Sequence, residues 1–238
     1  MQPVDAAGRR RLLQLAWQGT GAAIALAALP GLAVAGPRPR LGRDPFTLGV
    51  ASGDPDAQGA VLWTRLAPEP LLGGGMPSRA VPVRWFVAED PGMRRVVQRG
   101  VAAAVPELAH SVHVEVIGLR PGRDYFYRFS CDGDEESPIG HFRTTPLPDA
   151  RLDRLRLALC SCQAWNSGYY PVLADIARSD VDLVLHAGDY LYEYSPLQNA
   201  RGVVLDAQRF SGETTSLQRY RDQHALYKLD PDLQAAHA

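Results

Sequence analysis

The sequence predicts two regions of different fold: an antiparallel all-β sandwich over residues 44–146 and the start of an α/β domain over residues 154–238. The first region holds about seven short β-like runs separated by turn residues, a spacing typical of a sandwich. The second holds two apolar strands joined by a short helical stretch, which is a βαβ unit. With 238 residues and 46% hydrophobic residues, the chain can build a large core or two domains. Its net charge of −1 argues against nucleic acid as a main partner, so no nucleic-acid binding module is expected.

The first 35 residues predict an export signal, followed by a Pro-containing linker at 36–43. Arg9–Leu13 supplies a positive region, Leu15–Leu32 an apolar stretch, and Ala33–Ala35 a small-residue cleavage site. The arginine pair followed by two leucines resembles a twin-arginine signal, which implies the twin-arginine export machinery as a partner. The alternative is a membrane anchor, but the apolar stretch is short and interrupted by polar residues. We therefore expect no stable membrane anchor and a periplasmic or secreted location.

The sandwich is predicted from runs at 46–51, 60–65, 83–88, 96–105, 111–117, 125–131 and 139–144. Gly, Pro and Asp clusters lie between these runs and mark turns. The segment Leu119–Tyr125 is similar to the corner of an immunoglobulin or fibronectin type III domain, in which a tyrosine hydroxyl bonds back to nearby backbone. Trp63 and Trp85 are expected in the core.

The α/β region follows a second linker at 147–153. Its predicted elements are a strand at 155–162, a helix at 170–178, a strand at 181–186, a loop at 196–211 and a helix at 215–228, with another helix opening at Asp230. A parallel sheet needs both faces covered, and one βαβ unit cannot do this. The chain is therefore expected to be an N-terminal fragment of a longer protein.

Cys162 ends the first of the two predicted parallel strands, and Asp189 and Tyr192 come soon after the second. Because a βαβ crossover is right-handed, both strand ends point to the same edge of the sheet, where open α/β sheets bind ligands. A thiolate, a carboxylate and a phenolate at one edge suggest a metal site. In the alternative, Asp189 braces the loop and the tyrosines are packed aromatics. Spacing alone does not choose between Tyr192 and its neighbours Tyr190 and Tyr194.

Other polar and aromatic residues near this edge receive weaker interpretations. Cys160, inside the strand, is expected to fill space, and His186 to be a core histidine. His224 and His237 lie on predicted helices without a partner pattern, so no role follows for them. Aromatic and amide side chains after the first strand are expected at the mouth of the site: Trp165, Asn166, Tyr169 and Tyr170.

Five motifs occur in order along the chain: FTLGVASGDPDAQGAVLWTR at 46–65, CSCQ at 160–163, GYY at 168–170, GDYLYEY at 188–194 and RYRDQHALYKLDPDLQAAH at 219–237. Together they resemble PhoD-type alkaline phosphatases. The resemblance covers the chain from about Asp44 to its last residue. It implies an immunoglobulin-like domain followed by a metallophosphatase domain. It also implies hydrolysis of phosphate monoesters and diesters with Fe³⁺ and Ca²⁺, so that a phosphate ester is the expected substrate.

Carried over residue by residue, the resemblance implies three metal ligands. Cys162 matches an iron-ligating cysteine, Asp189 an aspartate shared between metals, and Tyr192 an iron-ligating tyrosine. The family's next motif, Trp-Asp-Asp-His-Glu, is absent and is expected shortly after Ala238. The remaining ligands, the nucleophile and the general acid stay unassigned, and the chain alone is expected to be inactive.

Two other functions remain open at this stage. The first is a phosphodiesterase with phospholipase D-type specificity. The second is a secreted non-catalytic binding module, in which the sandwich carries the function and the α/β part is vestigial.

Overall fold

The computed structural model describes residues 43–131 and 135–238. The predicted export signal at 1–35 and nearly all of the following linker lie outside the described residues. Within the two described ranges, no helix has the length and apolar character needed to cross a membrane.

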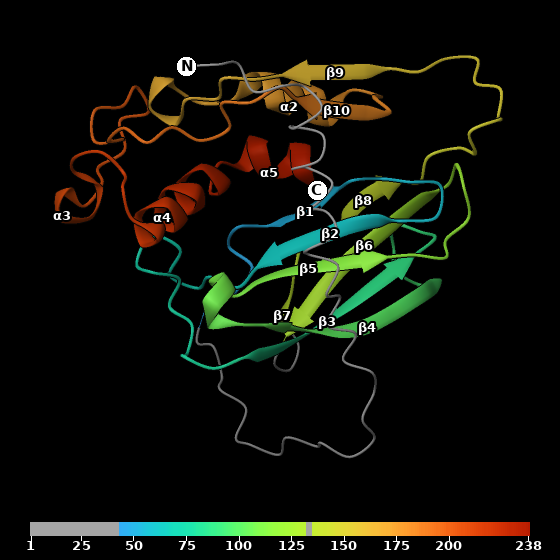
Figure 1. The fold of residues 1–238 in the computed structure, drawn as a ribbon, viewed down its shortest axis with the longest axis horizontal. Helices are drawn as coiled ribbons and strands as arrows, with labels where there is room; N and C mark the ends of the chain where they lie inside the picture. The colour runs from blue at the N-terminus through green and yellow to red at the C-terminus, as the bar shows by residue number, and fades with distance from the viewer. Residues whose placement is uncertain (1–42, 132–134) are drawn as a thin grey trace, which may run out of the picture. The chain divides into compact units, whose positions relative to one another are not determined.

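The first region is a sandwich of two antiparallel sheets (Figure 1). One sheet has the order β1-β2-β5. The other has the order β4-β3-β6-β7, with β8 also paired to β6. The strands are β1 Val50–Gly53, β2 Ala60–Arg65, β3 Val81–Ala88, β4 Val96–Ala104, β5 Ser111–Val116, β6 Asp124–Cys131, β7 Glu135–Glu136 and β8 Gly140–Arg143, with a 3₁₀ turn, η1, at Pro106–Leu108. The predicted antiparallel sandwich is therefore confirmed.

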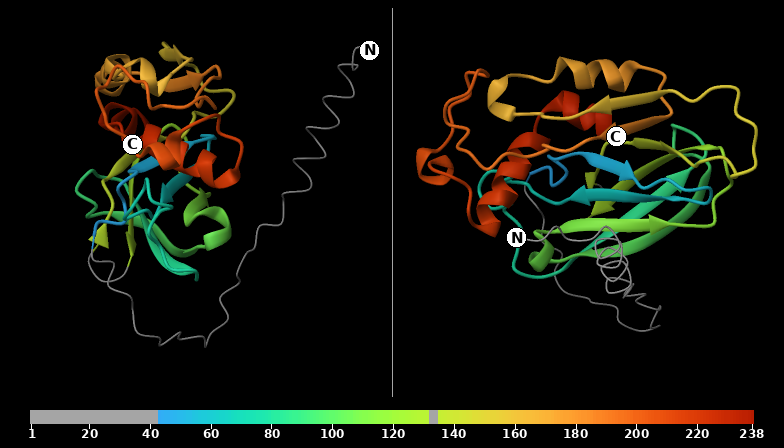
Figure 2. Two further views of the ribbon diagram at one scale, coloured as in Figure 1. Left: turned by 90° about the vertical axis from the view of Figure 1, so that its left-hand side faces the viewer. Right: turned by 45° about the horizontal axis from the view of Figure 1, so that its top comes forward.

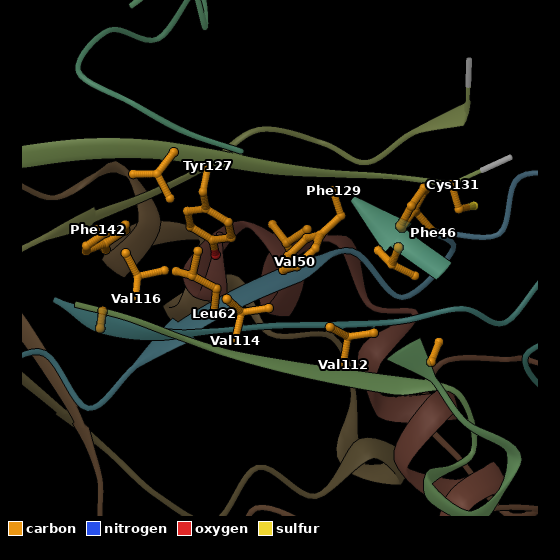
Figure 3. Close-up of a cluster of buried hydrophobic side chains, with 14 of the residues drawn as sticks. Phe46, Val50, Leu62, Val112, Val114, Val116, Tyr127, Phe129, Cys131 and Phe142 are labelled. Atoms are coloured by element: carbon orange, nitrogen blue, oxygen red, sulfur yellow. The ribbon is translucent and has the colours of Figure 1, made fainter. Parts of the chain in front are cut away.

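The core of the sandwich lies between the inner faces of these two sheets (Figure 3). Alternation in the sequence places it there, because successive side chains of a strand point to opposite faces. On β5, Val112, Val114 and Val116 are buried while the polar residues between them face outward. On β6, Tyr127 and Phe129 are 0% exposed. Aromatic and branched side chains from both sheets thus form one contiguous core.

The predicted tyrosine corner is present. The Tyr125 hydroxyl accepts a hydrogen bond of 3.0 Å from the Arg120 backbone N–H. The two tryptophans differ from the prediction, because Trp63 and Trp85 are only partly buried and pack at the edges of core clusters. Trp85 lies opposite Gly100 on β4, and a Cβ at Gly100 would come within 2.6 Å of the indole ring. The glycine therefore makes room for a ring that lies along the sheet.

The sandwich also contains one strand that the sequence did not indicate. β7 has only two residues, Glu135 and Glu136, and both are exposed. A two-residue polar strand has no alternation that could reveal it. Its pairing with Ser130 and Cys131 of β6 extends the larger sheet by one short edge.

The second region begins with a parallel strand pair. β9, Leu157–Cys160, pairs with β10, Leu183–His186, and the register joins Leu157 to Leu183 and Cys160 to His186. The connection contains a 3₁₀ turn, η2, at Trp165–Ser167 and helix α2, Pro171–Arg178. The predicted βαβ unit is confirmed, although both strands are shorter than predicted. Regular pairing stops soon after Cys160, because the backbone of Cys162 turns to a positive φ of 59°.

Three further helices follow: α3 Ala207–Phe210, α4 Leu217–Lys228 and α5 Pro231–His237. The single turn α3 lies inside the segment predicted as a loop. Ser216 caps α4 through its hydroxyl, and Asp230 caps α5 by accepting hydrogen bonds from two backbone N–H groups. The predicted helices at the C-terminal end are confirmed within two residues.

A second hydrophobic core lies among these helices and loops. Its buried members are Trp165, Tyr170, Leu173, Phe210, Leu226, Tyr227 and Leu233. Helix α5 packs against α2 and also contacts β1 of the sandwich. Helices α4 and α5 are the red segments in Figure 2. The Gln234 side chain of α5 donates a hydrogen bond of 3.0 Å to the backbone carbonyl of Thr47. The α/β region therefore rests on the sandwich through α5.

Candidate metal centre

Two non-glycine residues at the ends of β9 and β10 take the left-handed backbone conformation. Cys162 has a φ of 59° and Asp189 a φ of 54°, and Gly188 between strand and loop has a φ of 108°. Such values are uncommon for residues with a Cβ and gather at functional sites. Backbone hydrogen bonds continue past the strand ends, from Cys162 N–H to Gly188 O at 3.2 Å. The two turns are thereby held side by side.

The structure brings the three predicted site residues together. The Cys162 thiol lies 3.6 Å from Asp189 Oδ2, and the Tyr192 hydroxyl donates a hydrogen bond of 2.9 Å to the same oxygen. Both Cys162 and Asp189 are exposed to solvent. A Cβ added at Gly188 would meet no other atom within 4 Å, so there is open space beside the cluster. One sulfur and two oxygen donors thus face a common, accessible point.

The electrostatics of this cluster favour a neutral phenol while no cation is present. The hydrogen bond to Asp189 raises the pKa of Tyr192 most, and desolvation and the nearby Cys162 raise it further. A bound cation reverses this balance, because it favours the phenolate and the thiolate over their protonated forms. The chemistry of the donor set therefore fits a metal that takes both hard oxygen and softer sulfur ligands.

The geometry distinguishes the three tyrosines that sequence spacing left open. The Tyr190 ring stacks between His224 and His237, with centroid distances of 6.0 and 5.8 Å. Burial raises the pKa of Tyr190, as expected for a packed aromatic. The Tyr194 ring stacks on Tyr192 at 5.1 Å. In the described part of the chain, Tyr192 is the tyrosine whose hydroxyl bonds to Asp189.

The donor set is unusual in its third member. Among residues 43–131 and 135–238, no group of three or more His, Cys, Asp or Glu residues could hold a metal ion. The cluster at the strand ends has two donors of these kinds and completes the set with a phenol. The site therefore depends on the tyrosine for its third donor.

The weaker expectations near the site have mixed outcomes. Cys160 is partly buried and packs against the second core, and its pKa is raised by burial. His186 is half-buried beside the Tyr190 ring, and its Nδ1 accepts a hydrogen bond from Gly188 N–H. Trp165 and Tyr170 do not line a site mouth, because they are buried in the second core at 3% and 7% exposure.

Several residues around this edge received no role in the sequence analysis. Arg201 forms a buried ion pair with Asp230, and its guanidinium lies 4.5–4.8 Å from the ring centroids of three aromatic residues: Trp165, Tyr169 and Tyr170. Gln163 and Gln223 are buried and donate hydrogen bonds to the loop that carries Asp189 and Tyr192. Gln163 lies in the CSCQ motif and Gln223 in the motif at 219–237, but neither motif assigned these glutamines a role.

Comparison with known proteins agrees with these observations. The model of the PhoD-like phosphatase N-terminal domain matches residues 31–146, and the model of the PhoD-like phosphatase matches residues 157–238. The chain belongs to the PhoD-like phosphatase family. The boundary between the two matches falls in the linker between sandwich and α/β region, and the family resemblance of the sequence motifs is confirmed.

Two relatives show how much of a PhoD-like phosphatase this chain represents. Alkaline phosphatase D of Bacillus subtilis (strain 168) is 46% identical over 232 residues, which are 97% of this chain and 40% of that protein. A solved structure of PhoD matches with a TM-score of 0.77 and 48% identity, over 84% of this chain and 38% of that one. The chain thus spans two fifths of the length of the curated relative.

Proposed function

We propose that this chain supplies the first part of the iron centre of a secreted or periplasmic, metal-dependent phosphoric ester hydrolase. One observation carries the proposal: Cys162 Sγ, Asp189 Oδ2 and Tyr192 Oη face one point at the carboxyl edge of two parallel strands. Family membership supports it, because the relatives are named as phosphatases.

The three side chains would divide the work of holding metals. Thiolate and phenolate oxygen suit ferric iron, whereas Asp189, as a carboxylate, also suits a hard cation such as Ca²⁺ and can bridge two ions. When bound, such metals polarise phosphoryl oxygens and stabilise charge on the attacking and leaving oxygens. Cys162 and Asp189 both have positive φ values, and Cys162 Sγ lies 3.6 Å from Asp189 Oδ2. This chain's part in the reaction is therefore to bind and orient the metals.

The proposal is tested by hydrolysis assays on the full-length gene product. An aryl phosphate and a bis-aryl phosphate are offered with and without chelator. We expect turnover that chelator abolishes and that metal restores. The ratio of the two rates decides between monoester and diester preference.

Tyr192→Phe tests the phenol ligand, with Tyr194→Phe as the matched control on the neighbouring, stacked ring. We expect Tyr192→Phe to lower kcat/KM at least about 100-fold, because losing a ligand exceeds the 10–100-fold effect of losing its supporting partner. Tyr194→Phe should stay within about threefold of wild type. Turnover insensitive to chelator, or absent after metal loading, would contradict the proposal.

A further inference from the structure

The loop that carries two of the proposed ligands is held by glutamine side chains. This ligand loop, residues 189–194, contains neither helix nor strand. Gln163 donates from its backbone N–H to Asp189 O and from Nε2 to Tyr190 O, each at 3.1 Å. Gln223 donates from Nε2 to Tyr192 O at 2.6 Å and to Tyr194 O at 3.0 Å. Four backbone carbonyls of one short loop are thus bound from two sides.

The backbone of Gln163 and the side chain of Gln223 are themselves bound by buried residues. Gln163 is 8% exposed, and its backbone carbonyl accepts a hydrogen bond of 2.9 Å from the Tyr170 hydroxyl. Gln223 on α4 is 1% exposed, and its Oε1 accepts a bond of 2.9 Å from the Thr214 hydroxyl. Thr214 in turn donates its backbone N–H to Glu193 O. Each glutamine therefore connects the ligand loop to a buried part of the second core.

Such anchoring matters because a site on a loop is less precise than one on a helix or strand. The Tyr192 hydroxyl reaches Asp189 Oδ2 only while the backbone between them keeps its turn. Removing one buried donor leaves a carbonyl without its partner, which favours rearrangement of the loop. Within the described residues, both glutamine side chains donate to backbone carbonyls of the loop and not to the donor atoms of Cys162, Asp189 or Tyr192. Any effect of these hydrogen bonds on the donor atoms therefore passes through the backbone.

We propose that Gln163 and Gln223 are positioning residues that hold Asp189 and Tyr192 in ligand geometry. Gln163 also links the two strand ends, since it follows Cys162 and bonds to the loop after β10. Gln223 fixes the far end of the loop from α4. This inference rests on the proposed metal centre and extends it to the residues that shape it.

The test compares Gln163→Leu and Gln223→Leu with Gln234→Leu in the full-length protein. Gln234 is a matched control, because its Nε2 also donates to two backbone carbonyls, Thr47 O at 3.0 Å and Lys228 O at 2.7 Å, but away from the ligand loop. The melting temperature reports the general cost of each change. Two further readouts report on the loop: hydrogen exchange of its amides in metal-free protein, and the visible phenolate-to-iron absorption band with iron retention against chelator.

We expect Gln223→Leu and Gln163→Leu to speed exchange of the 189–194 amides by about tenfold or more. Iron affinity should fall by about 10–100-fold, as for other residues that support a metal ligand, and the absorption band should shift. Gln234→Leu should lower the melting temperature comparably, yet leave loop exchange and the band within about twofold of wild type. Should one ligand-loop variant fail to fold, the other carries the test.

Two results would overturn the inference in different ways. If wild type shows the band and both ligand-loop variants keep exchange, affinity and band like Gln234→Leu, the glutamines are ordinary core residues and the metal centre stands. If iron-loaded wild type shows neither bound iron nor a band, the metal centre itself fails and the positioning role fails with it.

Discussion

The sandwich and the strand pair β9–β10 use similar residues with different results. In the sandwich, alternating apolar side chains face a second sheet, and Phe129 and Leu62 are 0% exposed. On β9–β10, Leu157, Leu159 and Leu185 are 52%, 72% and 45% exposed. The register pairs Leu159 with Leu185, so both lie on the same face. The comparison teaches that an apolar strand is buried by the layer opposite it and not by its own pattern.

The two regions also differ in how they satisfy backbone groups. In the sandwich, strand pairing satisfies the backbone N–H and C=O groups. Strand β3 pairs with β4 on one side and β6 on the other, and β6 also pairs with β8. In the ligand loop, side-chain amides from Gln163 and Gln223 take over this task. The loop with the candidate centre thus depends on single side chains for its shape.

The largest expected effect is in the sandwich core. Phe129→Ala should lower the free energy of unfolding by about 3–5 kcal/mol, because it leaves a cavity where a side chain was fully buried. Denaturant titration followed by fluorescence measures this loss. A loss below about 1 kcal/mol would mean that the two sheets do not pack as described.

An intermediate effect is expected from pH in the α/β region. Burial, with the nearby charges of Lys228 and Arg65, lowers the pKa of His224 from 6.5 to about 4. The unfolded chain therefore binds a proton between pH 6.5 and 4 that the folded chain does not. The contribution of His224 to the free energy of unfolding is fully present above pH 6.5. It falls by about 3 kcal/mol as the pH drops to 4.

His224→Phe should remove this part of the pH dependence while keeping the contact with the Trp63 ring. The measurement is the free energy of unfolding at pH 4 and pH 7 for both proteins. Equal pH dependence in wild type and variant would show that His224 is not shielded from solvent.

The smallest effect is expected on the open face of β9. Leu159→Thr should change the free energy of unfolding by less than about 0.5 kcal/mol, since the side chain is 72% exposed. The same denaturant titration serves here. A loss of 2 kcal/mol or more would reveal a covering layer on this face and would remove the contrast with the sandwich.

The sequence allowed much of this architecture to be predicted, and the reasons are local. The alternating valines in β5 and the Tyr125 corner are patterns that span only a few residues. Both could therefore be predicted from the sequence alone. The parallel pairing of β9 and β10 followed from the handedness of a crossover. The exposed two-residue strand β7 and the half-buried tryptophans depend on neighbours distant in sequence, which no local pattern reveals.

In the candidate centre, too, some residues could be predicted from the sequence and others could not. Cys162 and Asp189 were predictable because each lies within three residues of a strand end. Tyr192 was not separable from Tyr190 and Tyr194 by spacing, since their distinction depends on ring contacts with α4 and α5. Gln223 lies in the motif at 219–237, but its role could not be predicted, because its partners lie about 30 residues earlier in the chain.

The central claim is that Cys162, Asp189 and Tyr192 share one iron ion. Anomalous X-ray diffraction at the iron absorption edge, from crystals of the iron-replete full-length protein, tests it most directly. We predict a single strong anomalous peak in contact with the sulfur, the carboxylate and the phenol oxygen. An iron-replete crystal with its anomalous peak elsewhere, or with none beside these three side chains, would contradict the account.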